Sequence, residues 1–172
     1  FFFLMNFALS QKILIPMDNA QTNHLKAYGI AFLHLENGNE IEWLLNYRGG
    51  SFLMDNQDNV ENICLVRGVN YEMINSTALS EIFTTIESNN MDIILLEKVP
   101  KIAVYSPPGK QHWDDAVTLA LTFADIKYDV VFDDEVMSNK INDYDWLHLH
   151  HEDFTGQYGK FYRSYRNKPW YK

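Results

Sequence analysis

The sequence contains a single cysteine, Cys64, among its 172 residues. One cysteine excludes an internal disulfide framework, and it also excludes a zinc or iron–sulfur site built on several thiolates. Glycine and proline are sparse as well, at 8 and 5 residues, which excludes a collagen-like or low-complexity chain. Because apolar residues make up 47% of the sequence, we expect a globular chain of about one domain in length rather than a disordered one.

Positive charge is also scarce, since 14 Lys and Arg stand against 23 Asp and Glu for a net charge of −9. A surface that coats nucleic acid or an anionic membrane needs an excess of positive charge. The sequence also lacks an apolar run of about 20 residues, the length of a transmembrane helix. We therefore expect no nucleic-acid partner and no membrane span.

The first ten residues are uncharged and mostly apolar, and the polar pair Gln11-Lys12 follows them. Ala8 and Ser10 have the small-x-small spacing that signal peptidase accepts before a cut at Gln11. This pattern predicts that residues 1–10 are the remnant of a signal peptide and that 11–172 are the mature domain. The alternative is an apolar first strand or core helix. An exported chain with one cysteine is typical of a bacterial protein that lies in the periplasm, at the cell surface or elsewhere in the cell envelope, or that is secreted.

Short apolar runs alternate with amphipathic segments from residue 12 to residue 150, which predicts alternating strands and helices. Strands are predicted at 13–17, 41–47, 93–96, 102–105, 128–132 and 145–150. Helices are predicted at 22–36, 78–87, 116–124 and from 133, while 60–66 is compatible with either state. The alternation predicts an α/β fold with a doubly wound, mostly parallel sheet and helices on both faces. Similar strand openings at Lys12 and Lys101 suggest a weak duplication of 11–100 and 101–172.

Ligands of such sheets bind outside the carboxyl ends of the strands. Asp18 follows the first predicted strand, and a loop with two glycines follows the second, where backbone N–H groups and the Arg48 guanidinium can hold an anion. The alternatives are a helix cap for Asp18 and a tight turn for the glycines. The predicted ligand-binding residues are Asp18, Arg48, Gly49, Gly50, Ser51, His112 and Trp113. Asp114 and Asp115 can line the same crevice, although acidic residues there also suit the start of a helix.

The densest chemistry lies between His148 and Asp153, where three histidines are followed by two carboxylates. In a strand, His148 and His150 share one face about 7 Å apart. Imidazole and carboxylate groups bind zinc, and they also form a general base with an orienting acid. The predicted metal ligands are His148, His150 and Glu152, for a divalent ion such as zinc, and the catalytic candidates are His150, His151, Glu152 and Asp153. The alternative is a structural role, with hydrogen-bonded histidines under a helix and carboxylates that cap the next segment.

Three motifs carry a resemblance to a known family: Leu44–Phe52, Trp113–Val117 and Tyr144–Phe161. Through them, residues 11–172 resemble a bacterial secreted family catalogued as asparagine synthetase B. The resemblance implies that the protein continues past Lys172, so we expect the aromatic and basic residues 160–172 to pack on that remainder. The segment from Lys101 to His150 also resembles the opening of class I glutamine-amidotransferase-like domains, which implies a flavodoxin-like sheet.

Cys64 does not lie in the Gly-x-Cys-x-Gly elbow that exposes an amidotransferase nucleophile. No Ser-Gly-Gly pyrophosphate loop is present either. The first functional hypothesis is therefore an exported, amidotransferase-like module that binds a small-molecule or envelope ligand without hydrolysing glutamine. The second is a metal-dependent or His/carboxylate hydrolase that acts on an amide or a glycan. The third is the asparagine synthetase or amidotransferase activity that the family name implies.

Overall fold

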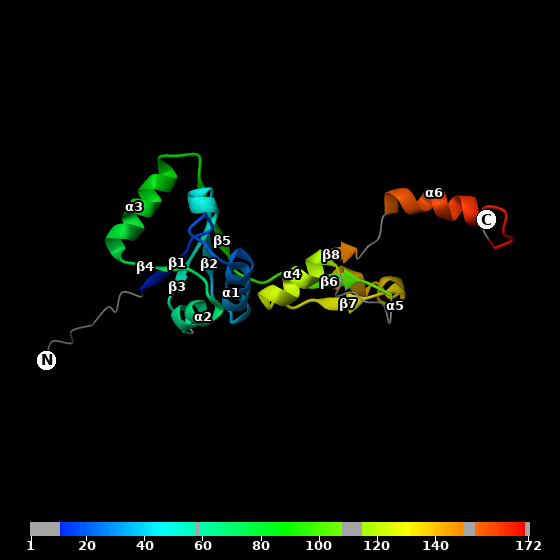
Figure 1. The fold of residues 1–172 in the computed structure, drawn as a ribbon, viewed down its shortest axis with the longest axis horizontal. Coiled ribbons are helices and arrows are strands. Elements are labelled where there is room, and N and C mark those ends of the chain that lie inside the picture. The colour runs from blue at the N-terminus through cyan, green and yellow to red at the C-terminus, as the bar shows by residue number, and fades with distance from the viewer. Residues whose placement is uncertain (1–10, 58, 108–114, 150–153, 171–172) are drawn as a thin grey trace. The chain divides into compact units, whose positions relative to one another are not determined.

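The computed structural model describes residues 11–57, 59–107, 115–149 and 154–170, and the chain folds as two compact units (Figure 1). Unit 1 takes in the chain up to Pro100 together with Leu119–Lys127. Unit 2 comprises Lys101–Thr118 and Tyr128–Lys172.

Unit 1 is built on a five-stranded sheet, here sheet A, in the order β4-β1-β3-β2-β5. All four neighbouring pairs are antiparallel. The strands are β1 (Lys12–Ile15), β2 (Ile41–Leu45), β3 (Ser51–Asp55), β4 (Glu72–Ile74) and β5 (Asp92–Leu96). The helices are α1 (His24–Glu36), α2 (Val60–Arg67) and α3 (Ser76–Glu87), and Tyr47–Gly49 forms a 3₁₀ turn.

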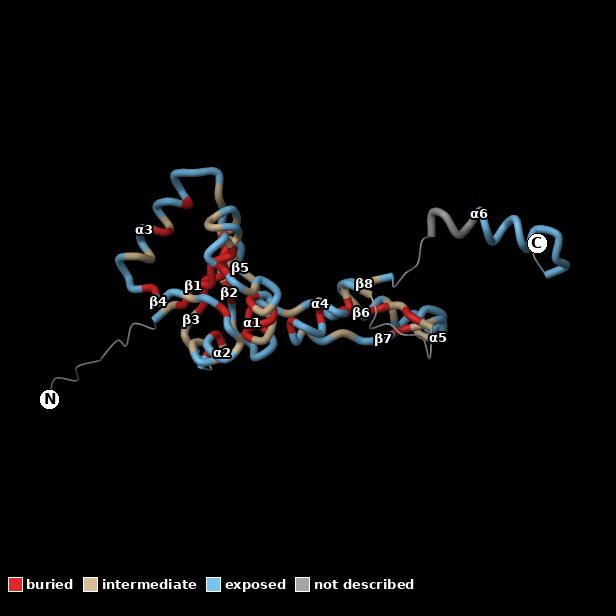
Figure 2. The backbone as a smooth tube through the Cα atoms, viewed as in Figure 1, coloured by how far each residue is buried: buried red, intermediate tan, exposed pale blue. Residues whose placement is uncertain are grey.

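Sheet A has a hydrophobic core on each face, because side chains alternate between the faces along each strand. Ile13 and Ile15 of β1 pack with α1 and α2, whereas Leu14 packs on the opposite face with Ile82 and Ile86 of α3. Figure 1 shows α3 across the sheet from α1 and α2, and Figure 2 shows the buried positions gathered along the strands between them. Sheet A is therefore the middle layer of three.

The first two predicted strands, β1 and β2, are not neighbours in the sheet, because β3 lies between them and runs antiparallel to both. The five residues Asn46–Gly50 connect β2 to β3, and a connection this short can join only antiparallel strands. Two of these residues are the glycines of the predicted ligand loop, which here form a hairpin turn. Strands β3 and β4 were not predicted.

Unit 2 is built on a three-stranded sheet, here sheet B, in the order β7-β6-β8, in which both neighbouring pairs are parallel. Its strands are β6 (Ile102–Tyr105), β7 (Asp129–Val131) and β8 (Trp146–Leu149). The helices that follow β6, β7 and β8 are α4 (Ala116–Ala124), α5 (Asp133–Met137) and α6 (Phe154–Tyr165), and Lys140–Asp143 forms a 3₁₀ turn. The last residues of α4, from Leu119 on, belong to unit 1.

The predicted doubly wound, mostly parallel sheet is therefore wrong for the chain as a whole. The fold is α/β, but its larger sheet is antiparallel and its parallel sheet has only three strands. The predicted helix at 22–36 is close to α1, whose N-cap is Asn23 and whose C-cap is Asn37. In the described part of the chain, no helix is long and apolar enough to cross a membrane.

Candidate functional site

The carboxyl end of sheet B brings together His148 of β8 and Asp115, which precedes α4. The Nε2 atom of His148 lies 3.0 Å from Oδ1 of Asp115, and the two side chains are 19% and 13% exposed. Strands β7 and β8 lie on opposite sides of β6. In open parallel sheets, the carboxyl ends beside such a reversal of strand order are where ligands bind.

Asp115 also caps α4, because its Oδ1 atom accepts hydrogen bonds from the backbone N–H groups of Val117 and Thr118 at 2.7 and 3.2 Å. Burial favours a higher pKa for this carboxyl group. The two backbone N–H groups and His148 together outweigh burial, so the pKa of Asp115 lies below its usual value. Asp115 is therefore an ionised acceptor at neutral pH, and it orients the imidazole of His148.

Ser106 follows β6 directly and is 1% exposed. Its backbone N–H group donates to the carbonyl of Val131 at 3.0 Å and so continues the ladder between β6 and β7. Val104 pairs in register with His148, and alternate residues of an extended chain share a face, which places Ser106 on the His148 face. Among the described residues, the buried Oγ atom of Ser106 has no hydrogen-bond partner. Such a group costs free energy unless water or a ligand satisfies it.

Among the described residues, three acidic residues follow β7 at this end of sheet B. Asp133 follows β7, and its Oδ1 atom accepts a hydrogen bond from the hydroxyl of Tyr105 at 2.7 Å. Asp134 and Glu135 follow in the first turn of α5. Together with Asp115, these carboxylates disfavour an anionic ligand. The groups available for binding, an imidazole, a hydroxyl and carboxylates, suit a neutral or positively charged ligand with amide or hydroxyl groups.

Six of the predicted site residues lie outside the described residues: His112, Trp113, His150, His151, Glu152 and Asp153. The predicted metal set of His148, His150 and Glu152 therefore stays a prediction. Within the part of the chain that the structure describes, no group of three or more His, Cys, Asp or Glu residues is arranged to hold a metal ion.

The structure does bring together Asp18 and the turn that contains Arg48. Arg48 donates from Nε to Oδ2 of Asp18 at 2.8 Å and from a terminal nitrogen to Oε1 of Glu72 in β4 at 2.7 Å. The two carboxylates raise the pKa of Arg48, and the hydrogen bond from Arg48 is the largest influence that lowers the pKa of Asp18. The guanidinium that was predicted to bind an anion is thus paired within unit 1.

The glycines and the serine of this turn also have structural roles. Gly49 has φ +82° and approaches the backbone of Met17 closely, while the N–H group of Met17 donates to the carbonyl of Arg48 at 3.1 Å. Gly50 has φ +90°, and its carbonyl accepts a hydrogen bond from Trp43 at 3.1 Å. The hydroxyl of Ser51 donates to the carbonyl of Tyr47 at 3.1 Å. Ligand binding by these residues stays a prediction.

Asp18→Asn is expected to lower the free energy of unfolding of unit 1 by about 1 kcal/mol at pH 7, the size of one partly exposed ion pair. The folded-state pKa of Asp18 lies below 3.8. The ion pair therefore stabilises the fold above that pH, and its contribution is lost as the pH falls through the lowered pKa. Urea unfolding should show the difference at pH 7, and the difference should shrink as the pH falls below 3.8.

A matched control is Glu97→Gln, which removes an exposed carboxylate that has no ion pair among the described residues. We expect this variant to leave the stability within about 0.5 kcal/mol of the wild type at both pH values. An Asp18→Asn defect of the same size at pH 7 and at pH 3 would contradict a charge effect.

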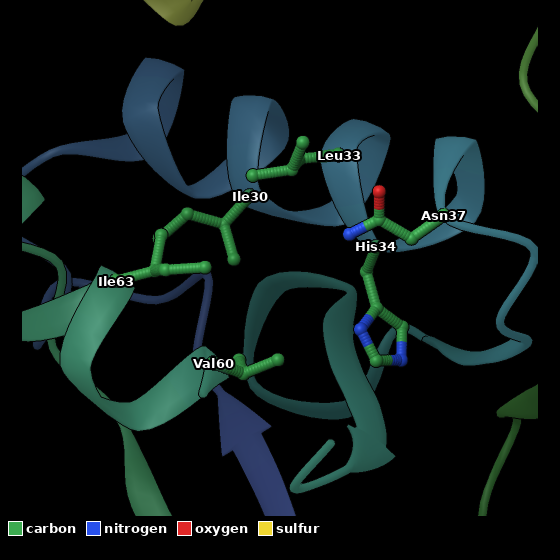
Figure 3. Close-up of a pocket in the computed structure, with 6 residues that line it drawn as sticks. All are labelled: Ile30, Leu33, His34, Asn37, Val60 and Ile63. Carbon is green, nitrogen blue, oxygen red and sulfur yellow. The ribbon is translucent and has the colours of Figure 1, made fainter. Parts of the chain in front are cut away.

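Cys64 is fully buried in α2, and burial raises the pKa of its thiol to about 11. The nucleophile in thiol chemistry is the thiolate, which is scarce at neutral pH for such a group. A hollow of about 10 Å³ lies between α1 and α2 and is lined by Ile30, Leu33, His34, Asn37, Val60 and Ile63 (Figure 3). This volume holds at most one water molecule, so it is not a ligand pocket.

Two site residues were missed or only half predicted from the sequence. Ser106 appeared as part of a turn, although its place directly after a buried strand is a signal for a residue at the ligand end of a sheet. Asp115 was predicted either as a crevice residue or as a partner for the helix dipole, and in the structure it caps α4 and also holds His148.

Comparison of the chain with protein-family models, with curated proteins and with solved structures found no match.

Proposed function

We propose that the chain is a binding protein for a small polar molecule, with its site at the carboxyl ends of β6 and β8. The observation that carries the proposal is the His148–Asp115 contact on the face of sheet B that Ser106 shares, where the buried hydroxyl of Ser106 has no hydrogen-bond partner among the described residues. An imidazole oriented by a carboxylate and a buried hydroxyl give directional hydrogen bonds to one ligand.

The ligand class follows from the charges of the site. The described residues at this end of sheet B include four carboxylates, so the ligand is neutral or positively charged and bears amide or hydroxyl groups. The buried thiol of Cys64 supports a module that does not use this cysteine to hydrolyse glutamine. An exported protein of the bacterial envelope remains part of this proposal, on the pattern of residues 1–10.

The test is a titration of the ¹⁵N-labelled chain in which the amide chemical shifts are monitored. The probes are L-glutamine, L-asparagine and N-acetylglucosamine, and inorganic phosphate is the anionic comparison. We expect at least one of the three probes without net charge, but not phosphate, to shift the backbone amide signals of Ser106 and His148. His148→Ala should weaken that binding about tenfold, the loss of one hydrogen bond. Asp115→Asn should weaken it less, because the imidazole stays in place.

His24→Ala is the matched control, because His24 belongs to unit 1 and contacts the carbonyl of Met17 at 3.1 Å. It should leave the titration unchanged. If none of the three probes shifts Ser106 or His148, or if His148→Ala binds as the wild type does, the proposal is wrong.

A second candidate is a His/carboxylate hydrolase, which the same contact favours because an imidazole held by a carboxylate is a general base with its orienting group. Release of ammonia from L-asparagine and release of p-nitrophenol from its N-acetylglucosaminide test the two substrate classes. A hydrolase of this kind would show activity that is lost in His148→Ala, and sensitivity of that activity to EDTA would assign it to the metal-dependent form. No release above the uncatalysed rate would exclude the hydrolase for these substrates.

A further inference from the structure

The charge of the chain is strongly divided along the sequence. Residues 154–172 contain five cations and no acidic residue, for a charge of +5. The residues before them hold nine Lys and Arg and all 23 Asp and Glu, for a charge of −14. The net charge of −9 that argues against an anionic partner is therefore an average over an acidic body and a basic end.

Aromatic residues gather on the same segment. The ring of Phe161 lies 4.7 Å from that of Tyr165 and 6.2 Å from that of Trp170, between centroids, and Tyr165 and Trp170 are 5.2 Å apart. Hydrogen bonds from the N–H groups of Arg166 and Lys168, to the carbonyls of Tyr162 and Tyr165, form the turn that follows α6. This turn brings Trp170 back beside the helix.

These rings are open to solvent, with Phe161, Tyr165 and Trp170 exposed by 45%, 38% and 62%. The tube in Figure 2 is exposed along the described part of α6. Lys160 and Ser164 line a shallow depression with Phe161 and Tyr165, and the guanidinium of Arg166 lies 5.7 Å from the ring centroid of Tyr162. Cations thus border an aromatic cluster, which is the composition of a helix that lies in the plane of a membrane interface.

We propose that α6 and the turn after it bind an anionic lipid surface. The aromatic cluster of Phe161, Tyr165 and Trp170 lies at the headgroup boundary. The acidic headgroups are bound by four cations: Lys160, Arg163, Arg166 and Lys168. Tryptophan and tyrosine favour this boundary because one part of each ring system is apolar and another part is polar. The rings contact one another, so they do not form the free platforms on which nucleic-acid bases stack. An anionic surface complements the charge of +5 on residues 154–172.

The test uses the full chain and sedimentation with vesicles of phosphatidylcholine, either pure or with 30% phosphatidylglycerol, at 50 and 500 mM NaCl. We expect binding only to the anionic vesicles, and a loss of more than about tenfold at high salt. Arg163→Ala with Lys168→Ala should weaken binding about 25-fold, since each cation contributes about fivefold. Trp170→Ala should weaken it without changing the salt dependence.

The matched control is Lys98→Ala with Lys140→Ala, which changes the net charge equally but outside the basic end. This control should bind within about twofold of the wild type, and circular dichroism should show that both double variants stay folded. Equal binding to both vesicle types, or equal loss in both double variants, would overturn the proposal. The proposal would also be overturned if the chain does not bind the anionic vesicles but binds a single-stranded oligonucleotide or self-associates in a salt-sensitive way.

Discussion

Gly29→Ala is expected to destabilise unit 1 by about 3 kcal/mol or more, the range of overpacked core substitutions that require backbone movement. Alanine normally improves a helix interior by up to about 1 kcal/mol relative to glycine. Here the sign is reversed, because a Cβ atom on Gly29 of α1 would overlap the carbonyl oxygen of Ala124 and lie 2.8 Å from its carbonyl carbon.

The backbone at Ala124 cannot easily give way, because the residues after it are held to the helices of unit 1. The carboxylate of Asp125 pairs with Lys26 at 3.1 Å and with Arg67 at 3.3 Å. Lys127 pairs with Glu36 at 2.7 Å. Ala124 itself is 1% exposed. Relief of the overlap must therefore separate the end of α4 from α1.

Urea unfolding measures this effect, and Gly159→Ala in α6 is the matched control. A Cβ atom on Gly159 would meet nothing within 4 Å, so this variant should gain helix content without losing stability. A Gly29→Ala protein as stable as the wild type would contradict the close packing of Ala124 on α1.

Gly49→Ala is the second large effect, and we expect it to cost about 3 kcal/mol through two separate causes. The backbone at Gly49 has φ +82°, which costs an alanine about 1–2 kcal/mol. The new Cβ atom would also overlap the carbonyl oxygen of Met17 and lie 2.9 Å from the nitrogen of Asp18. The Arg48–Asp18 ion pair depends on this close approach of the turn to β1.

Gly68→Ala separates the two causes. Gly68 ends α2 with φ +67°, but a Cβ atom there would meet nothing within 4 Å. This control should show only the conformational cost of about 1–2 kcal/mol. If Gly49→Ala costs no more than Gly68→Ala in urea unfolding, the contact between the turn and Met17 does not constrain unit 1.

Local signals predicted several elements of this fold. The Asn37-Gly38 pair marks the end of α1, and the apolar run at 102–105 is β6. Strand pairing was not predictable in the same way, because an apolar run does not show which strand lies beside it. The glycine turn at 49–50 was the signal that could have corrected the sheet, since two short apolar segments around a glycine turn form an antiparallel hairpin.

The candidate site was predictable only where residues directly follow predicted strands. Asp18 and Arg48 meet because the ends of β1 and β2 lie at one edge of sheet A. The His148–Asp115 contact joins residues 33 positions apart, so its prediction required the parallel pairing of β6 and β8 as well as the position of α4. The unsatisfied hydroxyl of Ser106 is a property of packing, which no spacing of residue types reveals.

The assignment of Leu119–Lys127 to unit 1 has a practical consequence for dissecting the protein. A fragment that stops at Pro100 would lack the backbone that covers Gly29, and it would also lack the carboxylate that neutralises Lys26 and Arg67. Such a truncation would therefore expose apolar surface of α1, and poor solubility of the fragment would say nothing about the autonomy of sheet A.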